Sequence, residues 1–233
     1  MLAAMLTIAV MFAAHMISPE GARFMSQMLY VWAHEIAHVG TALLGGGAGS
    51  HIVINADGSG HAVTSVVSPL HGVLVHAAGP ILPAWLAAFA LYTGVTRKGN
   101  TGLLVMQAAG LAGIAHFQAF DEQVRLALYV WAAATFALGI SPAPGALKAI
   151  GVLVISFTLT LGVVSSIDYL YVDFIDADPT RPSDAQAIKE ILGADDLSAV
   201  ANTLIVPMAV GYGLAAIFAT NWMRRHTPLT SKR

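Results

Sequence analysis

Two histidines and a glutamate lie close together in one apolar stretch of the chain, as His34-Glu35-Ile36-Ala37-His38. Histidines four residues apart project from the same face of a helix, so that both can reach one metal ion. Neutral imidazoles suit zinc, and a catalytic zinc site adds a third protein ligand and keeps one position for water. Glu35 adjoins the first histidine, where it can take a proton from zinc-bound water. The spacing therefore predicts His34 and His38 as zinc ligands and Glu35 as the catalytic base.

The setting of this motif separates it from chance occurrences of the same pattern, which are often found on solvated helix faces. Here the three ionisable residues lie inside an apolar run from Phe24 to Leu44. An ionised side chain at the centre of a bilayer costs at least about 2.5–3.5 kcal/mol. Such groups persist when they pair, bind metal or line a watery cavity, so the setting favours metal ligation over a hydrogen-bonded pair of core histidines.

The third ligand must be a histidine or a carboxylate, because the chain has no cysteine. Residues 39–49 contain no histidine, and Glu122 and Glu190, the two glutamates after the motif, are not in the helical context of a zinc ligand. An aspartate is therefore expected.

Asp184 is the best-placed aspartate, because it follows Pro182 and Ser183 at the expected start of a short helix that ends at Gly193. The alternative for Asp184 is an ordinary role at a helix N-terminus. Asp168 and Asp173 are the reserve candidates.

The composition indicates a membrane protein, with 57% hydrophobic and only 10% charged residues and a mean hydropathy of +0.71. Soluble domains carry roughly 25% charged residues. The apolar residues gather into runs of about 17–25, the length that crosses a hydrocarbon core. We expect an all-α multi-spanning membrane protein with about six to seven transmembrane helices. The predicted segments are 2–17, 24–44, 70–95, 101–120, 124–140, 146–170 and 199–222.

Two connecting segments differ from the rest. In residues 51–66, short β-branched runs flank Asp57-Gly58-Ser59-Gly60, which is typical of a β-hairpin. The hairpin follows the active-site helix and would either receive an extended substrate on its strand edge or serve as a plain connection. Residues 173–196 form an acidic, polar segment ahead of the last span.

The placement of lysine and arginine predicts the orientation, because cytoplasmic loops are enriched in these residues. With seven spans, eight lysine and arginine residues lie on one side of the membrane and three on the other. The C-terminus lies on the side with eight, which predicts that it is cytoplasmic. The eight are Arg23, Arg97, Lys98, Lys148, Arg224, Arg225, Lys232 and Arg233, and the three are Arg125, Arg181 and Lys189. The hairpin and the acidic segment are then external.

A formal net charge of −2, without a basic stretch that carries aromatic residues, argues against nucleic-acid binding. The expected partners are the lipid bilayer and a membrane protein or peptide substrate. Nothing in the sequence indicates the oligomeric state.

Four pieces in this order resemble the site-2 protease-like intramembrane zinc metallopeptidases, in particular their small bacterial M50B-like branch. They are His34-Glu35-Ile36-Ala37-His38, Asp57-Gly58-Ser59-Gly60, Ala78-Gly79-Pro80 and Ser183-Asp184-Ala185. The resemblance implies a zinc ion held by His34, His38 and a distal aspartate, for which Asp184 is the matching position. It also implies Glu35 as the base in peptide-bond hydrolysis within or beside the bilayer, and residence in the bacterial inner membrane.

The chain is accordingly expected to form a single membrane-embedded metallopeptidase domain over residues 1–233. Within it, residues 24–95 supply the active-site helix, the hairpin and the next span, and residues 173–222 supply the third ligand and the last span. The alternative function is a non-proteolytic membrane metal transporter or metal-binding protein, suggested by the scattered histidines His15, His71, His76 and His116.

Overall fold

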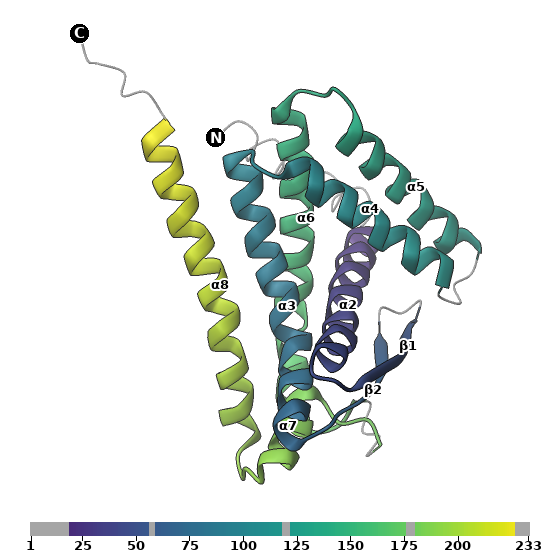
Figure 1. Ribbon diagram of the computed structural model, residues 1–233, viewed down its shortest axis with the longest axis vertical. Coiled ribbons are helices and arrows are strands. Elements are labelled where there is room, and N and C mark those ends of the chain that lie inside the picture. Colours follow the sequence, from purple (N-terminus) through teal and green to yellow (C-terminus); the bar gives the residue numbers. More distant parts are fainter. Residues whose placement is uncertain (1–18, 56–58, 118–121, 176–179, 227–233) are drawn as a thin grey trace.

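The computed structural model describes residues 19–55, 59–117, 122–175 and 180–226 (Figure 1). The predicted first segment, residues 2–17, lies outside the described residues. Each of the other six predicted segments is a helix. They are α2 (Pro19–Leu44), α3 (Pro69–Thr96), α4 (Asn100–Phe117), α5 (Glu122–Ile140), α6 (Gly145–Ser165) and α8 (Leu197–His226).

The chain is an integral membrane protein by its apolar helices. Three described segments are long and apolar enough to cross a bilayer, namely Pro69–Thr96, Gly145–Tyr171 and Leu197–His226. Polar side chains interrupt the apolar character of α2 and of α4, which contains Asn100, Gln107 and His116. The apolar stretch found in α5 is the shorter Leu128–Ile140. The count of six to seven spans therefore stays a prediction.

Helix α3 lies at the centre of the bundle, with α2, α6 and α8 packed around it (Figure 1). Its buried face is rich in alanine, including Ala84, Ala87 and Ala88, and small residues let helices approach closely in a membrane. Side-chain to backbone hydrogen bonds reinforce two of these contacts. Ser156 on α6 donates to the carbonyl of Ala87 at 2.8 Å, and the Trp85 indole donates to the α8 carbonyl of Pro207 at 3.0 Å.

The predicted hairpin is confirmed as two antiparallel strands, β1 (Ala48–Ile54) and β2 (Gly60–Ser65). Ile54 pairs with Gly60 next to the turn, and the register shifts by one residue between Gly49 and His51. The hairpin packs beside the C-terminal half of α2, as Figure 1 shows. A left-handed residue at Gly46, with φ of 83°, lets the chain turn from α2 into β1, because glycine adopts this conformation without steric cost.

The predicted short helix is also confirmed, as α7 (Asp184–Leu192). Ser183 is its N-cap and accepts a hydrogen bond from the amide of Gln186 at 3.2 Å, while Gly193 ends it in a left-handed conformation. Two backbone hydrogen bonds fix the start of α7: Ser183 donates to Asp173 at 3.1 Å, and Ile175 donates to Arg181 at 2.8 Å. This short antiparallel bridge brings α7 back against the bundle.

The two ends of the bundle differ. The α3–α4 and α5–α6 connections and the end of α8 lie at one end, whereas the hairpin and α7 lie at the other (Figure 1). Arg97, Lys148 and Arg225 belong to the first end. This arrangement agrees with the division of lysine and arginine on which the predicted orientation depends, and the orientation itself stays a prediction.

Candidate metal centre

Helix α2 presents His34 and His38 one turn apart on a single face. The two imidazole rings meet edge to face with their centroids 4.7 Å apart. Only 6% of His34 and 8% of His38 is exposed. Two such polar side chains in an apolar helix are stable only with partners, and the partners come from α7 and α3.

Asp184, the first residue of α7, brings its carboxylate to both histidines. Its Oδ2 lies 3.0 Å from Nε2 of His34 and its Oδ1 lies 3.5 Å from Nε2 of His38. One ligand-type atom from each residue falls within 4.8 Å of the other two, and all three side chains are buried. These are the two histidines and the aspartate singled out in the sequence, and the fold brings them to one point.

The hydrogen bonds around the group fit a cation between these three side chains. Nδ1 of His38 lies 2.8 Å from the carbonyl oxygen of Val75, and because a carbonyl only accepts, Nδ1 carries the proton. In the neutral ring Nε2 is then unprotonated, with its lone pair directed toward a carboxylate. Oδ2 of Asp184 is buried without a hydrogen-bond partner among the described residues. A metal ion would satisfy these facing lone pairs, and two imidazoles with one carboxylate are a donor set that suits zinc.

The charge state of Asp184 suits the same role. Burial raises the pKa of this carboxyl, but the adjacent imidazoles of His38 and His34 act against burial and hold the pKa well below its usual range. The carboxyl is therefore ionised at neutral pH, which is the form that ligates metals.

Three further side chains contact the group, and their roles were not assigned from the sequence. Nδ1 of His76 on α3 lies 2.9 Å from Oδ1 of Asp184, and the Tyr30 hydroxyl lies 3.2 Å from Nδ1 of His34. The hydroxyl of Tyr169 accepts a hydrogen bond from the backbone N–H of Asp184 at 3.1 Å. Such partners orient metal ligands. Tyr30 lies one turn before His34 on α2, so the helical spacing could have indicated it, but nothing local indicates His76 or Tyr169.

Gly79 on α3 makes room for the two imidazoles. A β-carbon at this position would overlap the His38 ring and would lie 2.9 Å from Nε2 of His34. The Ala78-Gly79-Pro80 piece noted in the sequence is therefore the point where α3 passes closest to the metal-binding group.

A cleft opens beside the group and contains Glu35. Its volume is about 380 Å³, and its lining includes His34, His38, Asp184 and residues 60–62 and 64 of strand β2. A second lobe of about 220 Å³ shares Glu35 and Tyr169 and extends toward Ser166. Glu35 is 5% exposed and is not a member of the ligand group. Glu35 thus lies beside the candidate ligands and lines the cleft.

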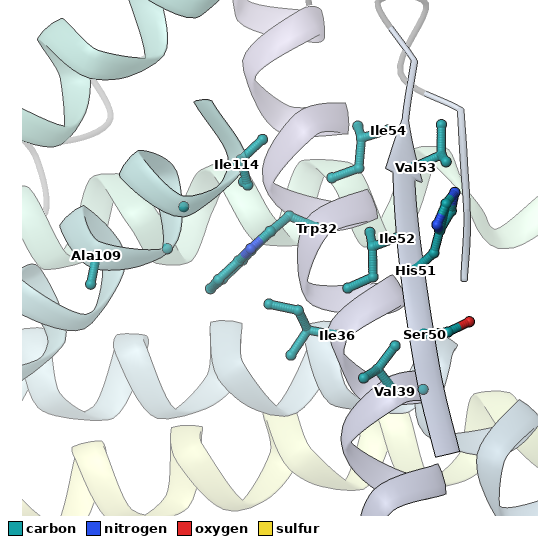
Figure 2. Close-up of a pocket in the computed structure, with 13 residues that line it drawn as sticks. Trp32, Ile36, Val39, Ser50, His51, Ile52, Val53, Ile54, Ala109 and Ile114 are labelled. Carbon is teal, nitrogen blue, oxygen red and sulfur yellow. The ribbon is translucent and has the colours of Figure 1, made fainter. Parts of the chain in front are cut away.

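The largest cavity is elsewhere, on a different face of α2. It has a volume of about 700 Å³ and lies between α2, β1 and α4. Figure 2 shows Trp32 and Ile36 of α2 directed into it, with Ile52 of β1 on one side and Ile114 of α4 on another. None of the metal-binding side chains lines this cavity, which separates it from the candidate metal centre.

Among the described residues, the other aspartates and histidines singled out in the sequence, apart from His76, neither belong to this group nor contact its side chains. Asp168 and Asp173 are exposed and outside it. His71 is engaged by backbone, since Nδ1 accepts from the Val67 amide at 3.2 Å and Nε2 lies 3.1 Å from the Thr41 carbonyl. His116 is exposed, with Nδ1 3.4 Å from the hydroxyl of Tyr129. His15 lies outside the described residues. The part of the chain that the structure describes holds a single group of potential metal ligands, so it offers no second site along a transport path.

The fold and the site together define an integral membrane protein with a buried group of two histidines and one aspartate that could hold a metal ion. A family model described as Peptidase M50B-like matches residues 1–223, and the chain belongs to this family. Comparison with curated proteins and with solved structures found no match. Membership of a peptidase family implies that the protein is a protease, and hence a hydrolase.

Proposed function

We propose that this protein is an intramembrane zinc metalloprotease that hydrolyses peptide bonds of membrane-associated substrates. The observation that carries the proposal is the convergence of His34, His38 and Asp184 at one buried point beside Glu35, within an open cleft. A buried carboxylate next to two imidazoles that are free to ligate describes a metal site, and a further carboxylate at the cleft supplies the base.

The residues at the site have separate roles in the proposed reaction. His34, His38 and Asp184 would hold the zinc ion, which would supply a Lewis acid to polarise the scissile carbonyl and to lower the pKa of a water molecule. Glu35 accepts a proton from the attacking water as its oxygen bonds to the carbonyl carbon. Glu35 then gives this proton to the departing amide nitrogen as the carbon–nitrogen bond breaks.

Strand β2 is the element that would align the substrate. Among the described residues it pairs with β1 alone, on one side, and its residues 60–62 and 64 line the cleft next to Glu35. A β-carbon at Gly60 would lie 3.1 Å from Oε1 of Glu35, so the strand begins directly beside the proposed base. An unwound peptide that paired with the free edge of β2 would pass the catalytic residues in an extended form.

The location of the site supports a membrane substrate. The cleft is lined by residues of β2 and by Asp184 of α7, and these two elements lie at one end of the bundle (Figure 1). Helix α7 packs against the α3 span. We propose residence in the bacterial inner membrane with a cytoplasmic C-terminus, which would place the cleft toward the external side. A metal transporter is less well supported, because His71, His76 and His116 do not form a second ligand group.

The proposal is tested by the substitution Glu35→Gln, which keeps the size and polarity of the side chain but removes the base. We expect it to lower the cleavage of fluorescein-labelled casein by purified protein at least about 100-fold, since general bases contribute roughly 10²–10⁴. Zinc content, measured by elemental analysis, should stay at one ion per chain because Glu35 is not a ligand. The matched control Glu122→Gln, at an exposed position on α5, should cleave like the wild type. Undiminished cleavage by Glu35→Gln would remove Glu35 from the mechanism.

A further inference from the structure

Two tyrosines contact the metal-binding group, and their hydroxyls have different hydrogen-bond partners. The ring centroid of Tyr30 lies 5.4 Å from that of His34, and the ring centroid of Tyr169 lies 6.0 Å from it. The Tyr30 hydroxyl lies 3.2 Å from an imidazole nitrogen of His34. The Tyr169 hydroxyl lies 3.1 Å from the backbone N–H of Asp184. The Tyr30 hydroxyl therefore contacts the side chain of one candidate ligand, whereas the Tyr169 hydroxyl contacts the backbone of another.

The hydroxyl hydrogen of Tyr169 remains available. A phenol has one hydrogen to donate and can also accept. Because the Asp184 N–H is the donor in the bond to Tyr169, this bond uses only an acceptor site of the oxygen. No acceptor for the Tyr169 hydrogen exists among the described residues. A hydrogen-bond donor without an acceptor, at a partly buried position, is positioned to act on a group that enters from outside.

Tyr169 is also placed where a substrate would lie. It ends the span formed by α6 and the short 3₁₀ helix η1 (Ile167–Tyr171). Its side chain lines both lobes of the cleft, as do Glu35 and His34. A peptide bond within reach of Glu35 is therefore in the same space as the Tyr169 hydroxyl.

Hydrolysis creates a group that needs such a donor. When the oxygen of water bonds to the carbonyl carbon, the π electrons of the carbonyl move to its oxygen, which becomes negatively charged. A preorganised donor directed at that oxygen is worth about 10²–10³ in kcat. We propose that Tyr169 is a catalytic residue that donates its O–H hydrogen bond to this oxyanion. The inference rests on the proteolytic function proposed above.

The proton and electrons balance without ionising Tyr169. Glu35 takes the proton from water and returns it to the amide nitrogen, which leaves with the electron pair of the carbon–nitrogen bond. The carbonyl double bond re-forms and the Tyr169 hydrogen bond weakens again. Tyr169 keeps its proton throughout, and its hydrogen bond stabilises the substrate only while the carbonyl oxygen is negatively charged.

A purely structural role makes a different prediction. Tyr169 also accepts the N–H of Asp184, and loss of this bond could displace the third ligand. If this were the only role of Tyr169, the substitution Tyr169→Phe would weaken zinc binding, and saturating zinc would restore activity. If Tyr169 stabilises the oxyanion, kcat falls while zinc binding and KM change little.

The experiment compares Tyr169→Phe with Tyr30→Phe in the purified full-length protein, using fluorescein-labelled casein as substrate and chelator competition to measure zinc affinity. For Tyr169→Phe we expect a loss in kcat of about 100-fold or more, with KM and zinc affinity within about threefold of the wild type. Tyr30→Phe removes a partner of the His34 ligand and should weaken zinc binding by about 10-fold or more, with most of its activity recovered at saturating zinc.

Two results for Tyr169→Phe would overturn the proposal: a kcat equal to that of the wild type, or a loss of activity that saturating zinc reverses. Both leave the proteolytic function intact, because they require an active wild-type protein. A wild-type protein that binds zinc but cleaves nothing would instead overturn the proposed function, and the role of Tyr169 with it.

Discussion

Among single residues, His38 and Asp184 are each oriented by a partner that is far away in the sequence. The Val75 carbonyl fixes the proton of His38 on Nδ1, and Nδ1 of His76 lies against one oxygen of Asp184. The other oxygen of Asp184 has no hydrogen-bond partner among the described residues. Oδ1 of Asp184 is thus oriented by His76, whereas Oδ2 faces Nε2 of His34. Because one oxygen is held in place and the other is unpaired, a single aspartate can complete the site.

The His76 contact gives a prediction at this scale. His76→Ala removes the donor that holds Oδ1 of Asp184, so the carboxylate should lose its fixed orientation. We expect zinc affinity, measured by chelator competition, to fall about 10–100-fold, as is usual when the partner of a metal ligand is lost. His51→Ala, at an exposed histidine of β1 outside the group, serves as the matched control and should bind zinc like the wild type. Equal affinities for the two variants would show that His76 does not orient the ligand.

At the scale of elements, the site depends on how closely α3 approaches α2. Gly79 is the contact point, because its missing β-carbon leaves the space that the His38 ring occupies. The approach is also held further along, where His71 on α3 lies within hydrogen-bond distance of the Thr41 carbonyl near the end of α2. A β-carbon at Gly45 would overlap this His71 ring. The contact of Gly79 with His38 and the contact of Gly45 with His71 therefore set the separation of α2 and α3 at two points along the helices.

Substitution of Gly79 tests this dependence. Gly79→Ala places a β-carbon against both imidazoles, so we expect zinc binding to be lost or reduced by more than about 100-fold even if the helices still assemble. Gly213→Ala on α8 is the matched control, since a β-carbon there meets nothing within 4 Å. In a helix this change should be neutral or stabilising by up to about 1 kcal/mol. Zinc content and the thermal unfolding midpoint of both variants measure the difference. Normal zinc binding by Gly79→Ala would show that α3 can move aside at no cost.

The sequence predicted accurately those helices whose ends are set by neighbouring residues in the chain. The bounds of α3 and α5 lie within two residues of those predicted, because long apolar runs end at polar or glycine-rich turns. Ser183 and Gly193 were likewise sufficient to indicate α7, as N-cap and C-cap residues. The predicted helix of residues 146–170 was less accurate, because the α-helix ends at Ser165 and continues as the tighter η1. Tyr169 belongs to η1, and no local sequence pattern indicated the change from α-helix to 3₁₀ helix.

In the whole molecule, Arg97, Lys148 and Arg225 lie at the end opposite the metal centre, whereas Arg181 and Lys189 lie at the same end as the metal centre. This supports an orientation in which the α5–α6 connection is cytoplasmic and the α7–α8 connection is external. The chain has no cysteine, so single cysteines can report the orientation directly. Pro142 and Asp195 are exposed residues on these two connections.

We predict that Asp195→Cys reacts with a membrane-impermeant maleimide added to intact bacterial cells, whereas Pro142→Cys reacts only after the cells are permeabilised. The measurement is the fraction of protein that carries the label, normalised to labelling in detergent. The reversed pattern would invert the orientation and place the proposed active site on the cytoplasmic side. Labelling of both positions in intact cells would mean that one of the predicted spans does not cross the membrane.

The amino-acid sequence alone was sufficient to predict the membrane class, the approximate positions of the helices and the motif at His34, Glu35 and His38. These features follow from hydropathy and from the period of one helix, which act over a few residues. It also singled out Asp184, but as one of several aspartates. Only the tertiary structure decided between them, because the bridge from Asp173 to Ser183 and the packing of α7 against α3 bring one carboxylate to the two imidazoles. The same packing brought His76 and Tyr169 to the site, since contacts between residues far apart in sequence depend on how the helices assemble.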